Sequence, residues 1–139
     1  MHTNPGTAAV RRPLLVTAVG VIGIVAGIFP LAEIVAILLS ARFAAWFLPL
    51  MRSILPVSDS FAFTLLFGIA LADIGFGIGV LARKRFARYG MIARSIIAVP
   101  IDYLNFTAGH RAGAFVGLAV SVFILWALLR ADSRSWFSA

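Results

Sequence analysis

The sequence predicts an all-α, polytopic membrane protein with four transmembrane helices in a small bundle and an interfacial helical segment after the first span. Of the 139 residues, 62% are hydrophobic and only 12% are charged, about half the charged share of an ordinary soluble domain. The mean hydropathy is +1.04, and the apolar runs are as long as the roughly 20 residues that cross a bilayer. In water such a chain would expose large apolar patches. We therefore exclude a soluble protein and treat residues 1–139 as a single integral membrane domain.

The first span is expected at residues 13–30, followed by an interfacial segment at 31–55. The apolar run over 13–39 is longer than one bilayer requires. Pro30 lacks a backbone donor and clashes with the preceding turn, so we expect a kink there. Beyond it, aromatic and cationic side chains mix, as they do at the level of the lipid headgroups. These side chains are Arg42, Trp46, Phe47 and Arg52. In the alternative interpretation, residues 31–50 cross the membrane as a separate span.

Three further spans are expected, at residues 60–82, 86–106 and 112–129. Pro56 disfavours helix at the residue before it, and Ser58 is placed to cap the helix that follows. The second span stops at the basic run 83–85, and Pro100 kinks or ends the third. The last span contains no charged residue.

The distribution of cations predicts that both termini are cytoplasmic. Lys and Arg are enriched in cytoplasmic connections. With the N-terminus inside, eight cations fall on that side, against three on the other, namely Arg42, Arg52 and Arg111. The eight are Arg11, Arg12, Arg83, Lys84, Arg85, Arg88, Arg130 and Arg134. We expect the first six to set the topology and to contact anionic lipid headgroups. A composition this rich in Arg and Ala is typical of a bacterium, which indicates its inner membrane and an uncleaved signal anchor at the N-terminus.

Four ionisable residues lie within or beside the predicted spans, and they are Glu33, Asp73, Arg94 and Asp102. Asp73 and Arg94 are each about nine residues from the basic run, which puts both at a depth of roughly 12–15 Å on adjacent antiparallel helices. A charge at this depth costs several kcal/mol unless it is paired or hydrated, so we expect the two to pair. Three roles remain open for the pair: pinning the two helices, lining a hydrated path or polar ligand site, and bonding to another subunit.

Asp102 and Glu33 are expected near the outer face of the membrane. Asp102 follows Pro100 by two residues, and Glu33 lies just beyond the predicted kink. Their expected counter-ions are the three outer arginines, Arg42, Arg52 and Arg111. Alternatively, two carboxylates at one face gather cations or protons.

Small residues recur at helical spacing in the predicted spans. In lipid, helices associate through close backbone approach, which small residues allow. The pairs are Gly23 with Gly27, Gly68 with Ala72, Gly75 with Gly79, and Gly113 with Gly117. We expect these positions to pack helices within the bundle, or to leave one face for a partner chain.

Catalytic and cofactor chemistry find no support in the residues. The chain has no cysteine, which removes thiolate metal sites and thiol nucleophiles. Two isolated histidines, His2 and His110, cannot supply a metal centre or paired haem ligation, and no nucleophile–base set can be assembled. The net charge of +7 sits in clusters between apolar runs, so we assign it to membrane topology and expect no nucleic-acid partner.

Two functions follow as hypotheses. The first is a small non-catalytic membrane subunit, without a cofactor, that packs into a larger membrane complex and scaffolds or modulates it. The second is a small homo-oligomeric transporter or channel that uses Asp73, Arg94 and Asp102, since four helices are too few to enclose a pore and shield it from lipid. In either case the partners are membrane lipids and other membrane subunits or copies of the chain itself.

Overall fold

The computed structural model describes residues 13–54, 58–107, 109 and 111–138, and in this part of the chain it contains six α-helices and no strand. The helices are α1 Leu14–Leu39, α2 Ala41–Ile54, α3 Asp59–Leu81, α4 Arg85–Thr107, α5 Arg111–Leu129 and α6 Ala131–Ser138. Three of them, α1, α3 and α5, are long and apolar enough to span a membrane. The predicted all-α membrane fold is therefore confirmed at this level, whereas the predicted fourth span, α4, does not reach the same apolar composition.

The first helix continues beyond the expected end of the first span. Pro30 lies inside α1, and the helix ends only at Leu39. Continuing past a proline loses one backbone hydrogen bond, whereas ending at residue 30 would leave several backbone groups without partners in an apolar segment. Helical structure thus continues beyond Pro30 as expected, and the helix that could span the membrane ends at Leu39 rather than at residue 30. A separate span over 31–50 is wrong because its first part belongs to α1.

The second helix begins after a break at Ser40. Ser40 has extended backbone, with φ −133° and ψ 104°, and its hydroxyl accepts a hydrogen bond of 3.2 Å from the amide of Phe43. This is the geometry of an N-cap. Because α2 has only 14 residues, it is about 21 Å long and shorter than the hydrocarbon core of a bilayer.

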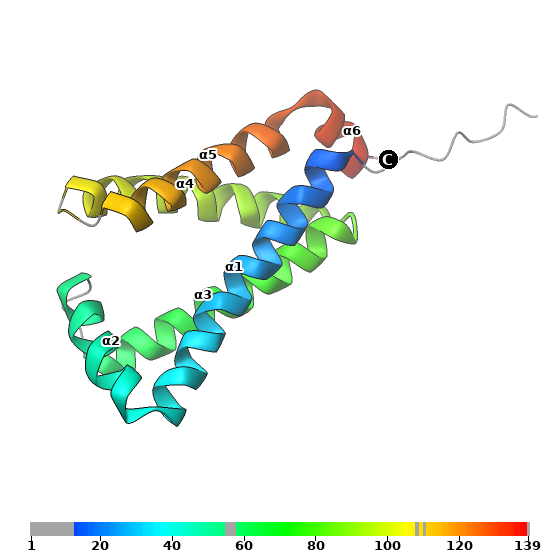
Figure 1. Cartoon of the computed structure of the whole chain (residues 1–139). Helices are drawn as coiled ribbons and strands as arrows, with labels where there is room; N and C mark the ends of the chain where they lie inside the picture. The colour runs from blue at the N-terminus through cyan, green and yellow to red at the C-terminus, as the bar shows by residue number, and fades with distance from the viewer. Residues whose placement is uncertain (1–12, 55–57, 108, 110, 139) are drawn as a thin grey trace, which may run out of the picture.

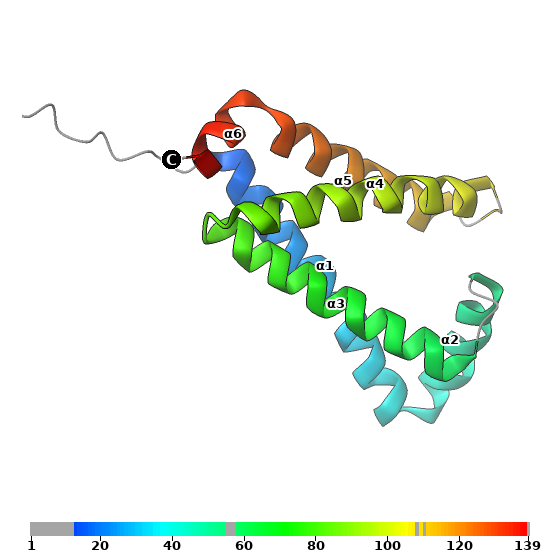
Figure 2. The same cartoon turned by 180° about the vertical axis from the view of Figure 1, so that it is seen from behind.

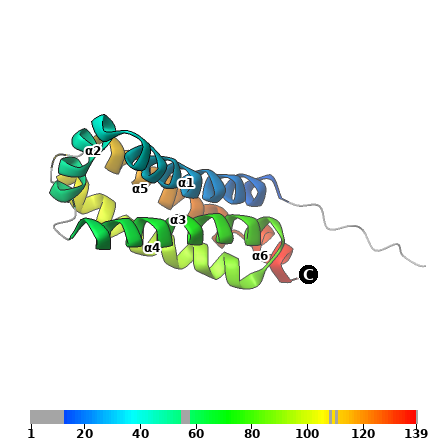
Figure 3. The same ribbon diagram turned by 90° about the horizontal axis from the view of Figure 1, so that it is seen from below.

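The long helices form two antiparallel pairs, α1 with α3 and α4 with α5 (Figure 1). The pairs meet near α6 and diverge toward the opposite end, where α2 lies (Figures 1 and 2). Seen from below, the helices run along a common direction, with α2 at one end and α6 at the other (Figure 3). The helices therefore pack closely at the α6 end and diverge at the other end, which we call the open end.

The apolar core lies at the α6 end, where five of the helices contribute side chains. Its buried members are Val16, Val19, Val80, Ala87, Met91, Ile124, Ala127, Leu128, Trp136 and Phe137. The short helix α6 closes this end by burying its two aromatic residues against the other helices. Its Ser133 hydroxyl donates to the Ala127 carbonyl at the end of α5, which holds α6 against the helix before it.

A tight turn connects α3 to α4. Arg83 has a φ of +63°, the Lys84 amide donates to the Gly79 carbonyl over 2.8 Å, and the Arg83 amide donates to the Val80 carbonyl over 3.2 Å. This pair of bonds is a Schellman motif, which usually has glycine at the left-handed position. Arg83 takes that position at a cost of about 1–2 kcal/mol, and its side chain donates to the Trp136 carbonyl of α6.

Candidate functional site

The predicted ion pair between Asp73 and Arg94 is present in the structure. Arg94 Nε lies 2.8 Å from Asp73 Oδ1, and Arg94 Nη2 lies 2.9 Å from Asp73 Oδ2. Both carboxylate oxygens are engaged, so the pair is bidentate and fixes the orientation of both side chains. It joins α3 to α4, as the depth arithmetic predicted.

Burial of this pair is uneven. The Asp73 side chain is 2% exposed, and the Arg94 side chain is 32% exposed. Asp73 is enclosed because the α3 backbone around it packs closely on α1: a Cβ added to Gly23 of α1 would lie 3.2 Å from the Asp73 carbonyl oxygen. The arginine therefore connects an enclosed carboxylate to a more open space.

That space is a cavity of about 420 Å³ along α3 and α4. Arg94 and Asp102 both line it, together with the apolar side chains of Ile69 and Phe76 from α3. Its apolar walls and two charged groups give it the character of a small-molecule or ion site.

Asp102 also reaches the fifth helix. A Cβ added to Gly117 of α5 would lie 2.6 Å from Asp102 Oδ2, so the carboxylate rests against the α5 backbone where there is no side chain. Charged groups thus lie on two neighbouring helices, with Asp73 on α3 and Arg94 and Asp102 on α4, and the Asp102 carboxylate contacts α5.

The expected ion pairs of Glu33 and Asp102 with the outer arginines are not found among the described residues. Arg52 does not pair with Glu33 or Asp102, because it forms an exposed bidentate pair with Asp59 at the start of α3, with Nε–Oδ1 at 2.9 Å and Nη2–Oδ2 at 2.6 Å. This hydrogen-bonded pair raises the pKa of Arg52 above its ordinary value. Arg52 and Asp59 are seven residues apart in the sequence, so they can pair locally, without tertiary packing between distant helices.

Glu33 and Asp102 have no ion pair within the described residues. Glu33 is half-buried on α1. Arg111 lines a second cavity of about 470 Å³ together with Asp102, at the open end of the molecule. His2, His110, Arg11 and Arg12 lie outside the described residues.

Two buried serines were not predicted. Ser95 of α4 and Ser121 of α5 are fully buried, and their hydroxyls have no hydrogen-bond partner in the part of the chain that the structure describes. Their helical positions could have revealed them: Met91, Ser95 and Asp102 are spaced four and seven residues apart, so they share one face of α4. A polar residue on the same helix face as Met91 and Asp102 would have indicated that Ser95 is buried against another helix.

The seven glycines singled out in the sequence fall into two groups. Four lie where a side chain would meet another part of the protein, and these are Gly23, Gly27, Gly79 and Gly117. Three face open space, and these are Gly68, Gly75 and Gly113. The sequence analysis did not single out Gly77, whose added Cβ would lie 2.7 Å from the Gly20 carbonyl oxygen of α1.

The described members of the predicted basic cluster surround α6. Arg83 donates to the Trp136 carbonyl, Arg85 to the carbonyls of Phe137 and Ser138, and Arg88 to the Leu128 carbonyl. Cations at the C-terminal ends of helices interact favourably with the helix dipole. The carbonyls they reach lie at the ends of α5 and α6.

Comparison with known protein families, with curated proteins and with solved structures found no match to this chain. In the described residues, no three His, Asp or Glu side chains come together as they would around a metal ion. The candidate site is therefore the polar line of Asp73, Arg94 and Asp102, with its adjoining cavity.

Proposed function

We propose that the protein is a small, non-catalytic subunit of a larger membrane complex, which it scaffolds or modulates by packing a face of α3 against a partner helix. One observation carries the proposal: α3 has two faces with small residues, and only one of them packs against another helix in the described part of the chain. Ala70 and Gly77 meet α1, whereas Gly68 and Gly75 face open space.

The unused face forms a shallow groove of about 350 Å³, which we call the α3 groove. It is lined by Phe61, Thr64, Leu65, Gly68, Ile69 and Ala72. Gly75 and Gly77 are two residues apart and therefore about 200° apart around the helix, so the groove lies on the side of α3 opposite α1. In lipid, a groove bordered by larger side chains is filled by the ridge of another helix, with a gain in dispersion contacts.

The proposal includes four membrane spans, with both termini in the cytoplasm. The support for α4 as the fourth span is its position: it lies antiparallel beside α5 along the length of that helix (Figures 1 and 2). A helix of 23 residues is about 34 Å long, enough to cross a bilayer. Cations concentrate at the α6 end, which supports a cytoplasmic location for that end, in a bacterial inner membrane. The short helix α2 then lies at the outer interface.

The test is photo-crosslinking from Leu65 in the native membrane, followed by purification and identification of the adduct. We expect a stoichiometric adduct with a different membrane protein. Gly68→Leu fills the groove and should abolish the adduct, whereas Gly113→Leu, at a second glycine that faces open space, should preserve it. Recovery of homo-oligomers alone, or equal loss in both variants, would contradict the subunit proposal.

The second candidate is a homo-oligomeric transporter, and the observation that favours it is the cavity shared by Arg94 and Asp102. In this case Asp102 faces a hydrated path, and the partner of the α3 groove is another copy of the chain. Flux into proteoliposomes distinguishes the two functions. Asp102→Asn should reduce flux without changing the thermal stability, whereas no flux by the wild type would leave only the subunit role.

A further inference from the structure

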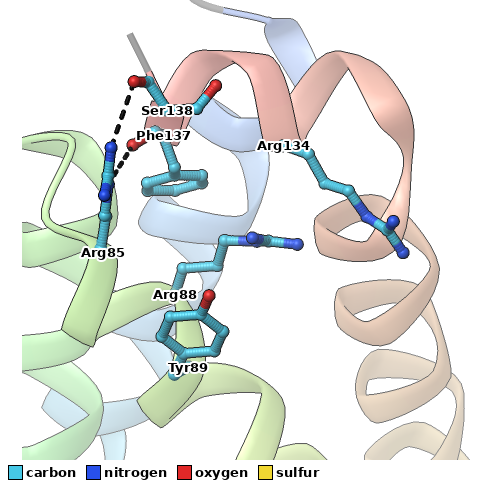
Figure 4. A pocket seen from close by; sticks show the side chains of 6 residues that line it. All are labelled: Arg85, Arg88, Tyr89, Arg134, Phe137 and Ser138. Carbon is cyan, nitrogen blue, oxygen red and sulfur yellow. Dashed lines mark hydrogen bonds between the residues drawn. The ribbon is translucent and has the colours of Figure 1, made fainter.

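A separate, smaller cavity lies at the α6 end, away from Asp73, Arg94 and Asp102, and three arginines border it. It has a volume of about 200 Å³ and is lined by Arg85, Arg88, Tyr89, Arg134, Phe137 and Ser138. Figure 4 shows the Arg88 guanidinium between the rings of Phe137 and Tyr89, with Arg85 on one side and Arg134 on the other. The guanidinium carbon of Arg88 is 5.6 Å from the Tyr89 ring centroid and 5.8 Å from that of Phe137, within cation–π range.

The three arginines have no carboxylate partner among the described residues. The ion pairs found there join Arg52 to Asp59 and Arg94 to Asp73, both outside this cavity. Arg85 and Arg88 reach only backbone carbonyls, which contribute the partial charge of a helix C-terminus and no full negative charge. Three positive charges therefore surround one small cavity, and no carboxylate of the described residues pairs with them.

These guanidinium groups also keep hydrogen-bond donors free. A guanidinium has five N–H donors. Arg85 uses its Nε and Nη2 on the carbonyls of Phe137 and Ser138, and Arg88 uses its Nε and Nη2 on the Leu128 carbonyl. The side chain of Arg134 is exposed on α6. The bonds to carbonyls fix two of the arginines in place, and the remaining donors are available to a planar or tetrahedral oxyanion.

The position of the cavity indicates the source of that oxyanion. It lies between the first turns of α4 and the helix α6 that follows the end of α5, which is the level at which the spans end. Aromatic residues gather at this level: Tyr89 is exposed, and Arg130 stacks over exposed Trp126 with 4.9 Å to the ring centroid. Aromatic residues mixed with cations are typical of the membrane interface, where lipid phosphates lie. The volume exceeds the roughly 30 Å³ share of one water, so a phosphate group fits.

We infer that this cavity is a binding site for the phosphate of an anionic phospholipid headgroup, held by Arg85, Arg88 and Arg134 at the cytoplasmic end of the molecule. The inference does not depend on which partner fills the α3 groove. It specifies one bound lipid at one place, beyond the general attraction of basic residues to the membrane surface.

The test is lipid binding to the full-length protein in detergent, counted by native mass spectrometry during titration with phosphatidylglycerol or with phosphatidylcholine of the same acyl chains. We expect one phosphatidylglycerol to bind preferentially. Arg134→Gln should weaken its binding about fivefold, as expected for one cation at the membrane surface, and Arg134→Lys should restore most of it. Arg134 is the main probe because the side-chain hydrogen bonds that dock α6 in the described structure come from Arg83 and Arg85, so the loss of the Arg134 side chain leaves them in place.

The matched control is Arg42→Gln, which removes an exposed cation of α2 at the other end of the molecule. Binding should remain unchanged in this variant. Equal weakening by Arg42→Gln, or equal affinity for the two lipids, would overturn the site. Displacement of phosphatidylglycerol by inorganic phosphate alone would assign the cavity to a soluble phosphate and overturn the lipid as its source.

Discussion

Asp73 and Arg94 contribute unequally to the ion pair that joins α3 to α4. The carboxylate sits on a short side chain that is 2% exposed, and the guanidinium ends a long side chain that is 32% exposed. A long cationic side chain can carry its charge to polar surroundings when its partner is removed. The enclosed carboxylate has no such path, so the cost of breaking the pair depends on which partner is lost.

For this ion pair we predict the outcome of a double-mutant cycle. Arg94→Leu strands the buried carboxylate and should lower the free energy of unfolding by about 3 kcal/mol, the lower end of the range for a broken buried pair. Asp73→Leu should cost less, and the double variant should recover most of the loss, which gives a large coupling energy. Denaturant unfolding in detergent measures all three.

The control is the same cycle at Arg52 and Asp59, which form an exposed pair of similar geometry. Water and salt screen that pair, so its coupling should be small and should fall further as salt is added. Additive losses at Asp73 and Arg94, or a larger loss from Asp73→Leu than from Arg94→Leu, would contradict the account of the buried pair.

Among the helices, α3 is central because two of its faces pack on different helices and a third remains free in the described structure. One face packs on α1 through glycine and alanine, a second pairs with α4 through Asp73, and the third is the α3 groove. The contact with α1 is close enough to involve backbone atoms: a Cβ on Gly77 would lie 2.7 Å from the Gly20 carbonyl oxygen and 2.8 Å from the Ile24 amide nitrogen.

We therefore predict opposite effects for two neighbouring substitutions. Gly77→Ala must separate the backbones of α1 and α3, and should lower stability by about 1–3 kcal/mol. Gly75→Ala meets nothing within 4 Å, and should be neutral or stabilising by up to about 1 kcal/mol because alanine favours helix over glycine. Thermal unfolding in detergent compares the two. Equal destabilisation would show that α1 and α3 are not packed as described.

Sequence reasoning was sufficient for α3 and the ion pair but not for α1. Hydropathy predicted the helix, and the rise per residue of a helix placed Asp73 and Arg94 at the same depth in the membrane. Their pairing followed from this shared depth. Helical structure beyond Pro30 was predicted, but the break at Ser40 between α1 and α2 was not, because no proline or glycine marks it in the sequence. Which glycines meet another helix depended on rotation about the helix axis, which spacing alone leaves open. For this reason Gly68 and Gly75 could not be distinguished from Gly23 and Gly27.

The whole molecule has a strong difference in charge between its two ends. Most described cations lie at the α6 end, including Arg83, Lys84, Arg85, Arg88, Arg130 and Arg134. At the open end, Arg52 is neutralised by Asp59. The helices run lengthwise between these ends (Figure 3), so one orientation in the membrane follows for all of them if α4 crosses beside α5.

We predict this orientation from cysteine labelling, since the natural chain has no cysteine. In intact cells, cysteines at Ala45 and Thr107 should react with an impermeant thiol reagent. Cysteines at Lys84 and Ser138 should react only after the membrane is opened. Lys84 and Thr107 lie at the two ends of α4, so equal labelling of these two positions would mean that α4 does not cross and that the chain has three spans.

The Schellman turn at Arg83 has a consequence for how the chain enters the membrane. Its connection is too short for α3 and α4 to be delivered separately, so the two helices reach the insertion machinery as one hairpin. Within that hairpin Arg94 pairs with Asp73, so the charge of Arg94 is neutralised within the helix pair and does not require α5. In the four-span arrangement, the apolar residues of α3 thus supply the partitioning free energy that α4 lacks, and the unit of insertion is the helix pair.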